Sequence, residues 1–339
     1  MKVVLFDSRR FERDVFTREN IHFGHDLTFL ESRLTPYTAE LARGFEVVCC
    51  FVNDQLDAGA LQTLKPLGVK LIALRSAGFN NVDLQTAAQL SLPVVRVPDY
   101  SPHAVAEFAV ALILTLNRKI HRAYLRVREL NFSLDGLVGF DLNGKTVGVI
   151  GTGKIGRVFA KIMQGFGCEV LAYDVNPDMD LVKSKTVKYV DLHTLYVQSD
   201  IISLHVPLNP STRHLINAEA IALMKPNVLL INTGRGALIE TKALITALKR
   251  RKIGGAGLDV YEEEEGVFFH DLSEQGISDD FLARLLTFPN VIVTSHQAFL
   301  TEEALRNIAF TTLANISQFE RGEALANEVT LIEPELELT

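Results

Sequence analysis

A glycine-rich turn follows an apolar run that is typical of a buried strand. Residues 147–150 (VGVI) lead into residues 151–156 (GTGKIG), and a helical pattern continues over residues 157–166. In this setting the first glycine allows a tight turn, the second lets the backbone approach a pyrophosphate, and the third lets helix and strand pack closely. Amides at the start of a helix also favour an anion. The segment predicts a dinucleotide site formed by Gly151, Gly153, Lys154, Ile155 and Gly156.

An acidic residue ends the next predicted strand. Asp174 follows residues 169–173, where a carboxylate accepts hydrogen bonds from ribose hydroxyls and repels a 2′-phosphate. The position favours NAD over NADP, and an ordinary glycine-rich turn is the alternative for the whole motif. Ligands of an open parallel sheet bind outside the carboxyl ends of its strands, so we expect more cofactor contacts at other strand ends. These are His205, Val206, Pro207, Thr233, Gly234 and Asp259.

An arginine and a histidine follow two further predicted strands, and they suit the reduction of a 2-keto acid. Arg235 stands among small neighbours, and a guanidinium binds a carboxylate through two parallel hydrogen bonds. His296 could donate a proton to the carbonyl oxygen, which gains negative charge as hydride arrives. Spacing alone leaves alternatives open, because Arg235 could be an exposed surface residue and His296 a structural one. His205 has a similar position and competes with His296.

A protonated histidine needs a neighbouring anion to stabilise its charged form. Residues 262–265 are four consecutive glutamates, and a run of like charge is usually a solvated surface. Composition and spacing do not choose among them.

The elements that would position these residues form two series of strands and helices. Strands are predicted at 3–6, 47–52, 70–74 and 94–97, with helices at 54–64 and 83–90 between them. A long helix begins near Pro102, and residues 104–116 are apolar almost all round, which predicts burial or a subunit interface. Continuous apolar strands separated by helices indicate parallel sheets covered on both faces. The second series of strands is predicted at 146–150, 169–173, 187–190, 201–205, 228–232, 255–259 and 291–294.

Composition narrows the partners. The formal charge of -7 argues against nucleic acid as the partner of this 339-residue chain, because phosphate binding favours a basic surface. The three cysteines have no zinc-site or disulfide spacing, which predicts reduced thiols and no metal site. The first apolar run is too short for the apolar region of a signal peptide, and the longest apolar run is much shorter than a membrane-spanning helix. We therefore expect a cytoplasmic protein.

Several segments together resemble one known family. They are residues 74–83 (LRSAGFNNVD), 149–156 (VIGTGKIG), 232–238 (NTGRGAL), 259–262 (DVYE) and 296–301 (HQAFLT). Over nearly its whole length the chain resembles the D-isomer-specific 2-hydroxyacid dehydrogenases, and within them the fermentative members that form D-lactate. The resemblance implies an NAD-dependent oxidoreductase that interconverts a small 2-keto acid and a D-2-hydroxy acid, with pyruvate and D-lactate as the leading pair. A larger 2-keto acid is the first alternative, and an NADH-sensing regulatory protein is the second.

The resemblance also implies roles for individual residues. Arg235 would bind the substrate carboxylate, Glu264 would pair with His296, and His296 would act as the acid, with His205 near the cofactor. Glu264 argues against a formate dehydrogenase, since the formate enzymes of the family carry glutamine in place of the acid partner. Glycine at 234 departs from the family's usual serine or similar small residue; it preserves access but loosens the backbone. The remaining substrate contacts implied are the amides of Ala77 and Gly78 and the pocket walls Phe51, Tyr100 and Phe299, for which core packing is the alternative.

The domain layout follows from the same resemblance. Residues 1–100 with 299–339 would form the substrate-binding domain, and residues 101–298 the NAD-binding Rossmann domain, with a cleft between them. Both would be Rossmann-like or flavodoxin-like α/β domains with parallel sheets. The chain would be a homo-oligomer, either a dimer or a tetramer.

Overall fold

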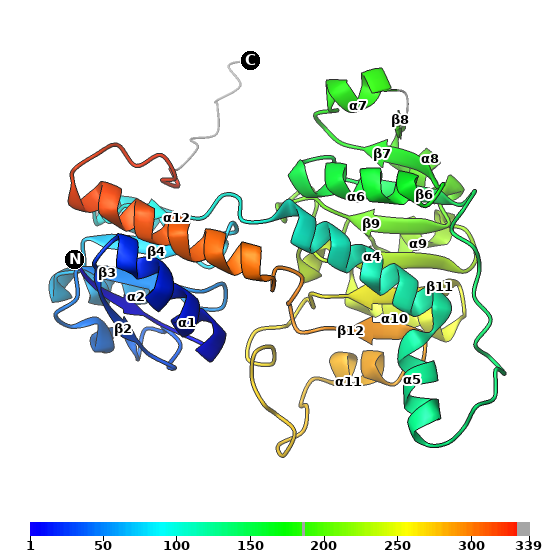
Figure 1. Cartoon of the computed structure of the whole chain (residues 1–339), viewed down its shortest axis with the longest axis horizontal. Coiled ribbons are helices and arrows are strands. Elements are labelled where there is room, and N and C mark those ends of the chain that lie inside the picture. Colours follow the sequence, from blue (N-terminus) through cyan, green and yellow to red (C-terminus); the bar gives the residue numbers. More distant parts are fainter. Residues whose placement is uncertain (185–186, 331–339) are drawn as a thin grey trace. The chain divides into compact units, whose positions relative to one another are not determined.

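The chain folds into two compact α/β units. The structure is a computed structural model that describes residues 1–184 and 187–330. Residues 1–101 and 300–330 form unit 1, and the described residues of Pro102–Phe299 form unit 2. Each unit contains one sheet in which all described strand pairs are parallel (Figure 1). The expected α/β class with two parallel-sheet units is confirmed. No described helix has both the length and the apolar character needed to cross a bilayer.

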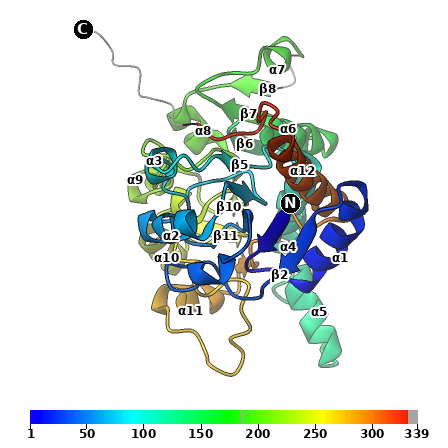
Figure 2. The ribbon, with the colours of Figure 1, turned by 90° about the vertical axis from the view of Figure 1, so that its left-hand side faces the viewer.

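Unit 1 is a five-stranded sheet of order β2-β1-β3-β4-β5. This is the flavodoxin-like order, in which the chain changes direction between β1 and β3. Helices α1 and α12 pack together on one face, and α2 and α3 lie on the other (Figure 2). The bounds are β1 (Lys2–Leu5), α1 (Arg10–Glu19), β2 (Asp26–Phe29), β3 (Val47–Cys50), α2 (Ala58–Leu64), β4 (Leu71–Leu74), α3 (Leu84–Gln89), β5 (Val94–Val95) and α12 (Glu302–Glu320).

Unit 2 is a seven-stranded sheet of order β12-β11-β10-β9-β6-β7-β8. The order reverses at β6, between β9 and β7, which makes the β6/β9 edge the place where a dinucleotide fits. Helices α4 and α6 cover one face, and α8 to α11 cover the other. The bounds are α4 (Pro102–Arg118), α5 (Ile120–Arg128), β6 (Thr146–Ile150), α6 (Lys154–Gly165), β7 (Glu169–Tyr173), α7 (Met179–Ser184), β8 (Val187–Tyr189), α8 (Leu192–Gln198), β9 (Ile201–Leu204), α9 (Ala218–Leu223), β10 (Val228–Asn232), α10 (Thr241–Lys249), β11 (Ile253–Leu258), α11 (Asp280–Leu286) and β12 (Val291–Val293).

Several predicted bounds need correction. The helix after the glycine turn begins at Lys154 and not at 157, because Gly153 in extended conformation already serves as its N-cap. Helix α2 begins at Ala58 and not at 54, since the Asp57 carboxylate accepts from the Ala60 amide and starts the helix there. The predicted strands agree with the observed ones to within two residues at each end. Strand β2 and helix α1 were not predicted, because their mixed polarity carries a weak apolar pattern.

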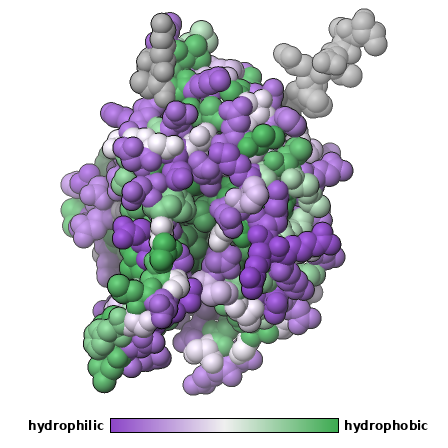
Figure 3. Space-filling view, turned by 90° about the vertical axis from the view of Figure 1, so that its right-hand side faces the viewer, coloured by the Kyte–Doolittle hydropathy of each residue, from purple (hydrophilic) through white to green (hydrophobic). Residues whose placement is uncertain are grey.

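Helices α4 and α5 differ sharply in burial. The apolar side chains of α4 are largely buried against the sheet and α6, as its composition predicted. Helix α5 and the segment after it expose many apolar side chains, which gather at the lower left of the face in Figure 3. They are Ile120, Tyr124, Leu125, Val127, Leu130, Phe132, Leu134 and Val138, and we call them the α5 surface.

Candidate active site

The candidate catalytic residues of unit 2 follow three neighbouring strands. Arg235 comes after β10, Glu264 after β11, and His296 after β12. Strand β11 pairs in parallel with both β10 and β12, so the three segments leave the sheet at the same carboxyl edge. This is the edge at which open parallel sheets bind ligands. Residues far apart in the sequence are thus gathered on one side of unit 2.

The structure distinguishes Glu264 from the other glutamates of its run. Its Oε1 accepts from Nδ1 of His296 at 2.7 Å, and its Oε2 accepts from the Tyr261 amide at 3.1 Å. The His296 side chain is 14% exposed and the Glu264 side chain 18%, so water only weakly screens the interaction between them. Because Nδ1 faces the carboxylate, the opposite ring nitrogen, Nε2, is left to carry a proton toward a substrate.

Asp259 holds the segment that carries His296. Its carboxylate is fully buried and accepts from Thr294 Oγ1 at 2.6 Å, the Gln297 amide at 2.9 Å and the Ala298 amide at 2.8 Å. Its carbonyl accepts from the His296 amide at 2.7 Å. His296 has a φ of 53°, which a non-glycine residue adopts only when its surroundings enforce it. These bonds position His296, whereas a cofactor contact of Asp259 remains a prediction.

Arg235 is placed by its own loop. The Asn232 side chain donates to the Arg235 carbonyl at 2.8 Å and accepts from the Gly234 amide at 3.0 Å, which locks the turn after β10. Among the described residues, the Arg235 guanidinium donates one hydrogen bond, to the Gly234 carbonyl at 2.8 Å. With five N–H donors, it retains the capacity for a two-pronged contact with a carboxylate.

The glycine turn fits a dinucleotide. Gly151 has a φ of 95°, and a Cβ on it would lie 2.5 Å from the His205 carbonyl oxygen. A Cβ on Gly156 would lie 1.9 Å from the Gly151 oxygen, whereas one on Gly153 would meet nothing within 4 Å. The middle glycine therefore borders open space at the start of α6, where a pyrophosphate can approach. Thr233 Oγ1, after β10, is buried without a hydrogen-bond partner among the described residues.

Asp174 is held by a network that the sequence did not reveal. Its Oδ2 accepts from the Thr152 amide at 2.6 Å and from Thr152 Oγ1 at 3.1 Å. Tyr189 on β8 donates to Thr152 Oγ1 at 2.8 Å and accepts from the Asp178 amide at 2.9 Å. A carboxylate offers about four acceptor sites, so Asp174 can still receive ribose hydroxyls. Thr152 was visible inside the glycine motif, but no local signal connects it to Tyr189.

His205 lies beneath the glycine turn. Its ring packs on Phe159 at 4.9 Å between centroids, and Nε2 lies 2.9 Å from Ser203 Oγ. Burial lowers the pKa of His205 to about 3, so the imidazole is neutral near pH 7. A neutral ring is a poor general acid, which favours His296 over His205 for proton transfer. Val206 and Pro207 continue this segment toward the surface.

The remaining predicted substrate contacts lie mainly in unit 1. Neither the Ala77 nor the Gly78 amide donates a hydrogen bond within the part of the chain that the structure describes, so both can serve a ligand. Phe51 is buried, the Arg75 guanidinium lies 5.4 Å from its ring centre, and its role as a pocket wall stays a prediction. Tyr100 and Phe299 are partly buried, in units 1 and 2 respectively.

The fold and site define an NAD-dependent oxidoreductase. Residues 110–298 match the family described as D-isomer specific 2-hydroxyacid dehydrogenase, NAD binding domain. Unit 2 supplies the expected cradle of glycines, the acidic residue after β7 and an acid–base pair at the same sheet edge.

Similar proteins agree with this class over almost the whole chain. A D-lactate dehydrogenase of Escherichia coli is 51% identical over 329 residues, which cover 97% of this chain and all of that protein. The solved apo-structure of D-lactate dehydrogenase from Escherichia coli has a TM-score of 0.89 and covers 97% of this chain and all of its own. A solved D-2-hydroxyisocaproate dehydrogenase is 34% identical, with a TM-score of 0.85, and covers 97% of this chain and all of its own. The chain belongs to the D-isomer-specific 2-hydroxyacid dehydrogenases.

Proposed function

We propose that this protein reduces pyruvate to D-lactate with NADH, reversibly. The observation that carries the proposal is the 2.7 Å pair between Glu264 and His296, on the same sheet edge as Arg235. The similarity to D-lactate dehydrogenases over 97% of the chain supports the choice of substrate. We further propose that unit 1 binds the substrate and that unit 2 binds NAD, since the family match falls within unit 2.

Each residue has a defined task in this proposal. Arg235 and the amides of Ala77 and Gly78 bind the substrate carboxylate. When bound, the nicotinamide supplies the hydride for the carbonyl carbon. His296, protonated and held at Nδ1 by Glu264, gives its Nε2 proton to the carbonyl oxygen, and in the reverse direction it takes that proton back. Gly151, Gly153, Gly156 and the other strand-end residues hold the cofactor.

The first experiment follows the decay of NADH absorbance with pyruvate and then analyses the lactate on a chiral column. We expect rapid decay and D-lactate alone. Formation of L-lactate, or turnover of pyruvate that is far slower than turnover of other 2-keto acids, would contradict the proposal.

A larger 2-keto acid is the second candidate, and the similarity to a D-2-hydroxyisocaproate dehydrogenase favours including it. A panel of linear, branched and aromatic 2-keto acids, compared by kcat/KM, separates the two. An NADH-sensing regulator would instead bind NADH tightly and oxidise it with none of these acids.

We also propose that the protein is a cytoplasmic homo-oligomer. The α5 surface exposes apolar side chains, including Phe132 at 69% and Leu134 at 80%, which a second copy could cover (Figure 3). The three cysteines are free and buried, which suits a reducing compartment. Light scattering should give the mass of a dimer or tetramer, and Leu125→Asp should lower it. A monomeric wild-type protein would refute the oligomer.

A further inference from the structure

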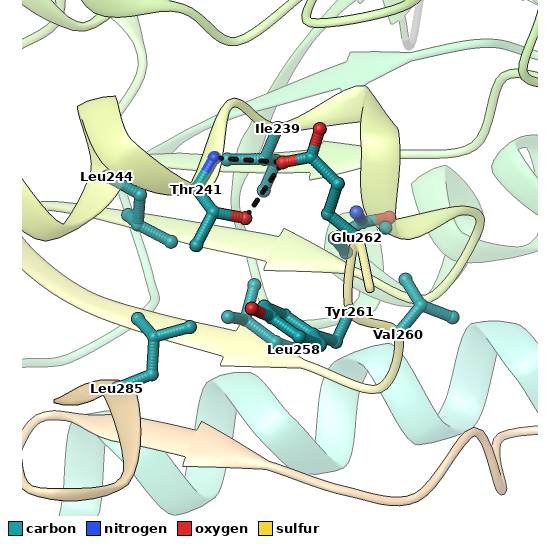
Figure 4. A pocket seen from close by; sticks show the side chains of 10 residues that line it. Ile239, Thr241, Leu244, Leu258, Val260, Tyr261, Glu262 and Leu285 are labelled. Carbon is teal, nitrogen blue, oxygen red and sulfur yellow. Dashed lines mark hydrogen bonds between the residues drawn. The ribbon is translucent and has the colours of Figure 1, made fainter. Parts of the chain in front are cut away.

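The four consecutive glutamates after β11 have different surroundings. Glu264 faces His296, and Glu263 and Glu265 are exposed, whereas the Glu262 side chain is 14% exposed and points toward α10 (Figure 4). We propose that Glu262 is a positioning residue that fixes the Glu264 turn against the Arg235 loop, with His214 as its partner. This inference rests on the proposed function, because it assigns a task to a residue that supports the same site.

The Glu262 carboxylate joins two separate elements. Its Oε2 accepts from the Thr241 amide at 3.3 Å and from Thr241 Oγ1 at 3.0 Å (Figure 4). Thr241 is the first residue of α10, whose N-cap Glu240 makes no side-chain capping bond. Glu262 therefore satisfies a free amide of that helix and places negative charge at its positive end.

The other carboxylate oxygen contacts two side-chain nitrogens. Glu262 Oε1 lies 2.5 Å from His214 Nε2 and 3.5 Å from Arg213 Nη2. Burial acts to raise the pKa of Glu262, but the hydrogen bonds from His214 and Thr241 outweigh it and hold that pKa below its ordinary value. The carboxylate is thus charged near pH 7 and is held from two directions.

The anchored residue is next to the donor that holds Glu264. The amide of Tyr261 donates to Glu264 Oε2 at 3.1 Å, and its buried side chain donates to Asp279 Oδ2 at 2.7 Å. If the Glu262 side chain loses its partners, the turn loses its anchor on the far side of Tyr261, so the residues from 262 onward can shift and the orientation of Glu264 toward His296 changes with them. Glu262 therefore acts on His296 only through Glu264.

The same peptide presses on the loop of Arg235. A Cβ on Gly236 would lie 2.0 Å from the Tyr261 carbonyl carbon and 2.4 Å from the Glu262 amide nitrogen. Only glycine permits this approach, so the residue after Arg235 is in direct contact with the Glu264 turn. A displacement of about 1 Å at such a contact can cost about 100-fold in turnover.

Few groups near Glu262 could replace its carboxylate as the partner of Thr241. The small cavity beside it is lined mainly by apolar side chains, among them Ile239, Leu244 and Leu285, with Asn232 and Tyr261 as polar neighbours (Figure 4). Truncating Glu262 would leave Thr241 facing this apolar region without its carboxylate. The turn would then relax and not rebuild the same bonds.

The test compares Glu262→Gln and Glu262→Ala with Glu263→Gln, which removes the same charge from the exposed neighbouring residue. For each protein we would measure kcat with pyruvate, the NADH dissociation constant, the melting temperature and the pH profile of pyruvate reduction. We expect kcat to fall about 10-fold in Glu262→Gln and about 100-fold in Glu262→Ala. NADH affinity should stay within about twofold of wild type, because the glycine cradle is untouched.

The pH profile distinguishes positioning from general damage. Reduction needs a proton donor held in place, so a badly oriented Glu264 should change the pH profile of kcat in Glu262→Ala, which a loss of stability alone would not do. Glu263→Gln should leave kcat and the profile unchanged. An unchanged kcat and an unchanged pH profile in both Glu262 variants would overturn the inference, and so would a parallel loss of kcat, NADH affinity and melting temperature.

If Glu262→Ala does not fold, the same measurements on Glu262→Gln decide the test. A folded wild-type protein that oxidises NADH with none of the 2-keto acids would instead refute the proposed function, and this inference with it.

Discussion

Replacing Gly156 with alanine tests the cofactor cradle most directly. A Cβ at this position would lie 1.9 Å from the Gly151 oxygen, and ordinary van der Waals contact begins at 3.4 Å, so α6 and the turn must separate by about 1.5 Å. Such overpacking typically costs about 1–3 kcal/mol of stability. A shift of this size also breaks a hydrogen bond from the start of α6 to a bound pyrophosphate, which is worth about 2 kcal/mol or about 30-fold in affinity.

The assay is titration of the purified variant with NADH, followed by fluorescence, together with a thermal melt. Gly165→Ala is the matched control, because Gly165 ends the same helix and a Cβ there would meet nothing within 4 Å. The control should bind NADH as wild type does, and alanine should stabilise it slightly by reducing the freedom of the unfolded chain. A Gly156→Ala protein with the melting temperature and NADH affinity of wild type would refute the packing argument.

Three further predictions address the reaction and its pH dependence. His296→Gln should lower kcat by about 100-fold or more without weakening NADH binding, because the proton donor is lost while the glycine turn that binds the cofactor is unchanged. Steady-state rates and an NADH titration measure the two effects, and near-normal turnover would exclude this role for His296. Arg235→Lys should raise the KM for pyruvate strongly, since an ammonium lacks the two-pronged geometry, and an unchanged KM would contradict this. His205 takes up a proton near pH 6.5 when unfolded but only near pH 3 when folded, so stability should fall as the pH drops between these values. Urea unfolding at pH 7 and pH 5 should show wild type losing about 2 kcal/mol more than His205→Asn, and equal losses would speak against a neutral, buried ring.

Local pattern was enough to predict the strands of unit 2. Strands β6, β7 and β10 have the predicted bounds, because a buried parallel strand is apolar along its whole length. The glycine turn was predictable for a similar reason, since its three glycines serve backbone geometry within six residues. By contrast, β2 (Asp26–Phe29) is an edge strand with partly exposed side chains, so its sequence carries little of the burial signal.

Spacing also placed the ends of strands, and with them Arg235, His296 and Asp174. Parallel strands bring their carboxyl ends to one edge, so a polar residue just past such a strand is near a site whatever the details of the loops. The family resemblance added the identity of the partner glutamate, which composition alone left open among four.

What only the tertiary structure decided is which atoms meet. Residues 262–265 have identical side chains, and their separate surroundings come from the turn after β11 lying between β12 on one side and the Gly236 loop on the other. Tyr189 on β8 supports Asp174 through Thr152, and the neutrality of His205 comes from burial against Phe159. Hydrogen bonds and burial act over a few ångströms in space, so the sequence determines which groups are available, and folding alone determines which of them touch.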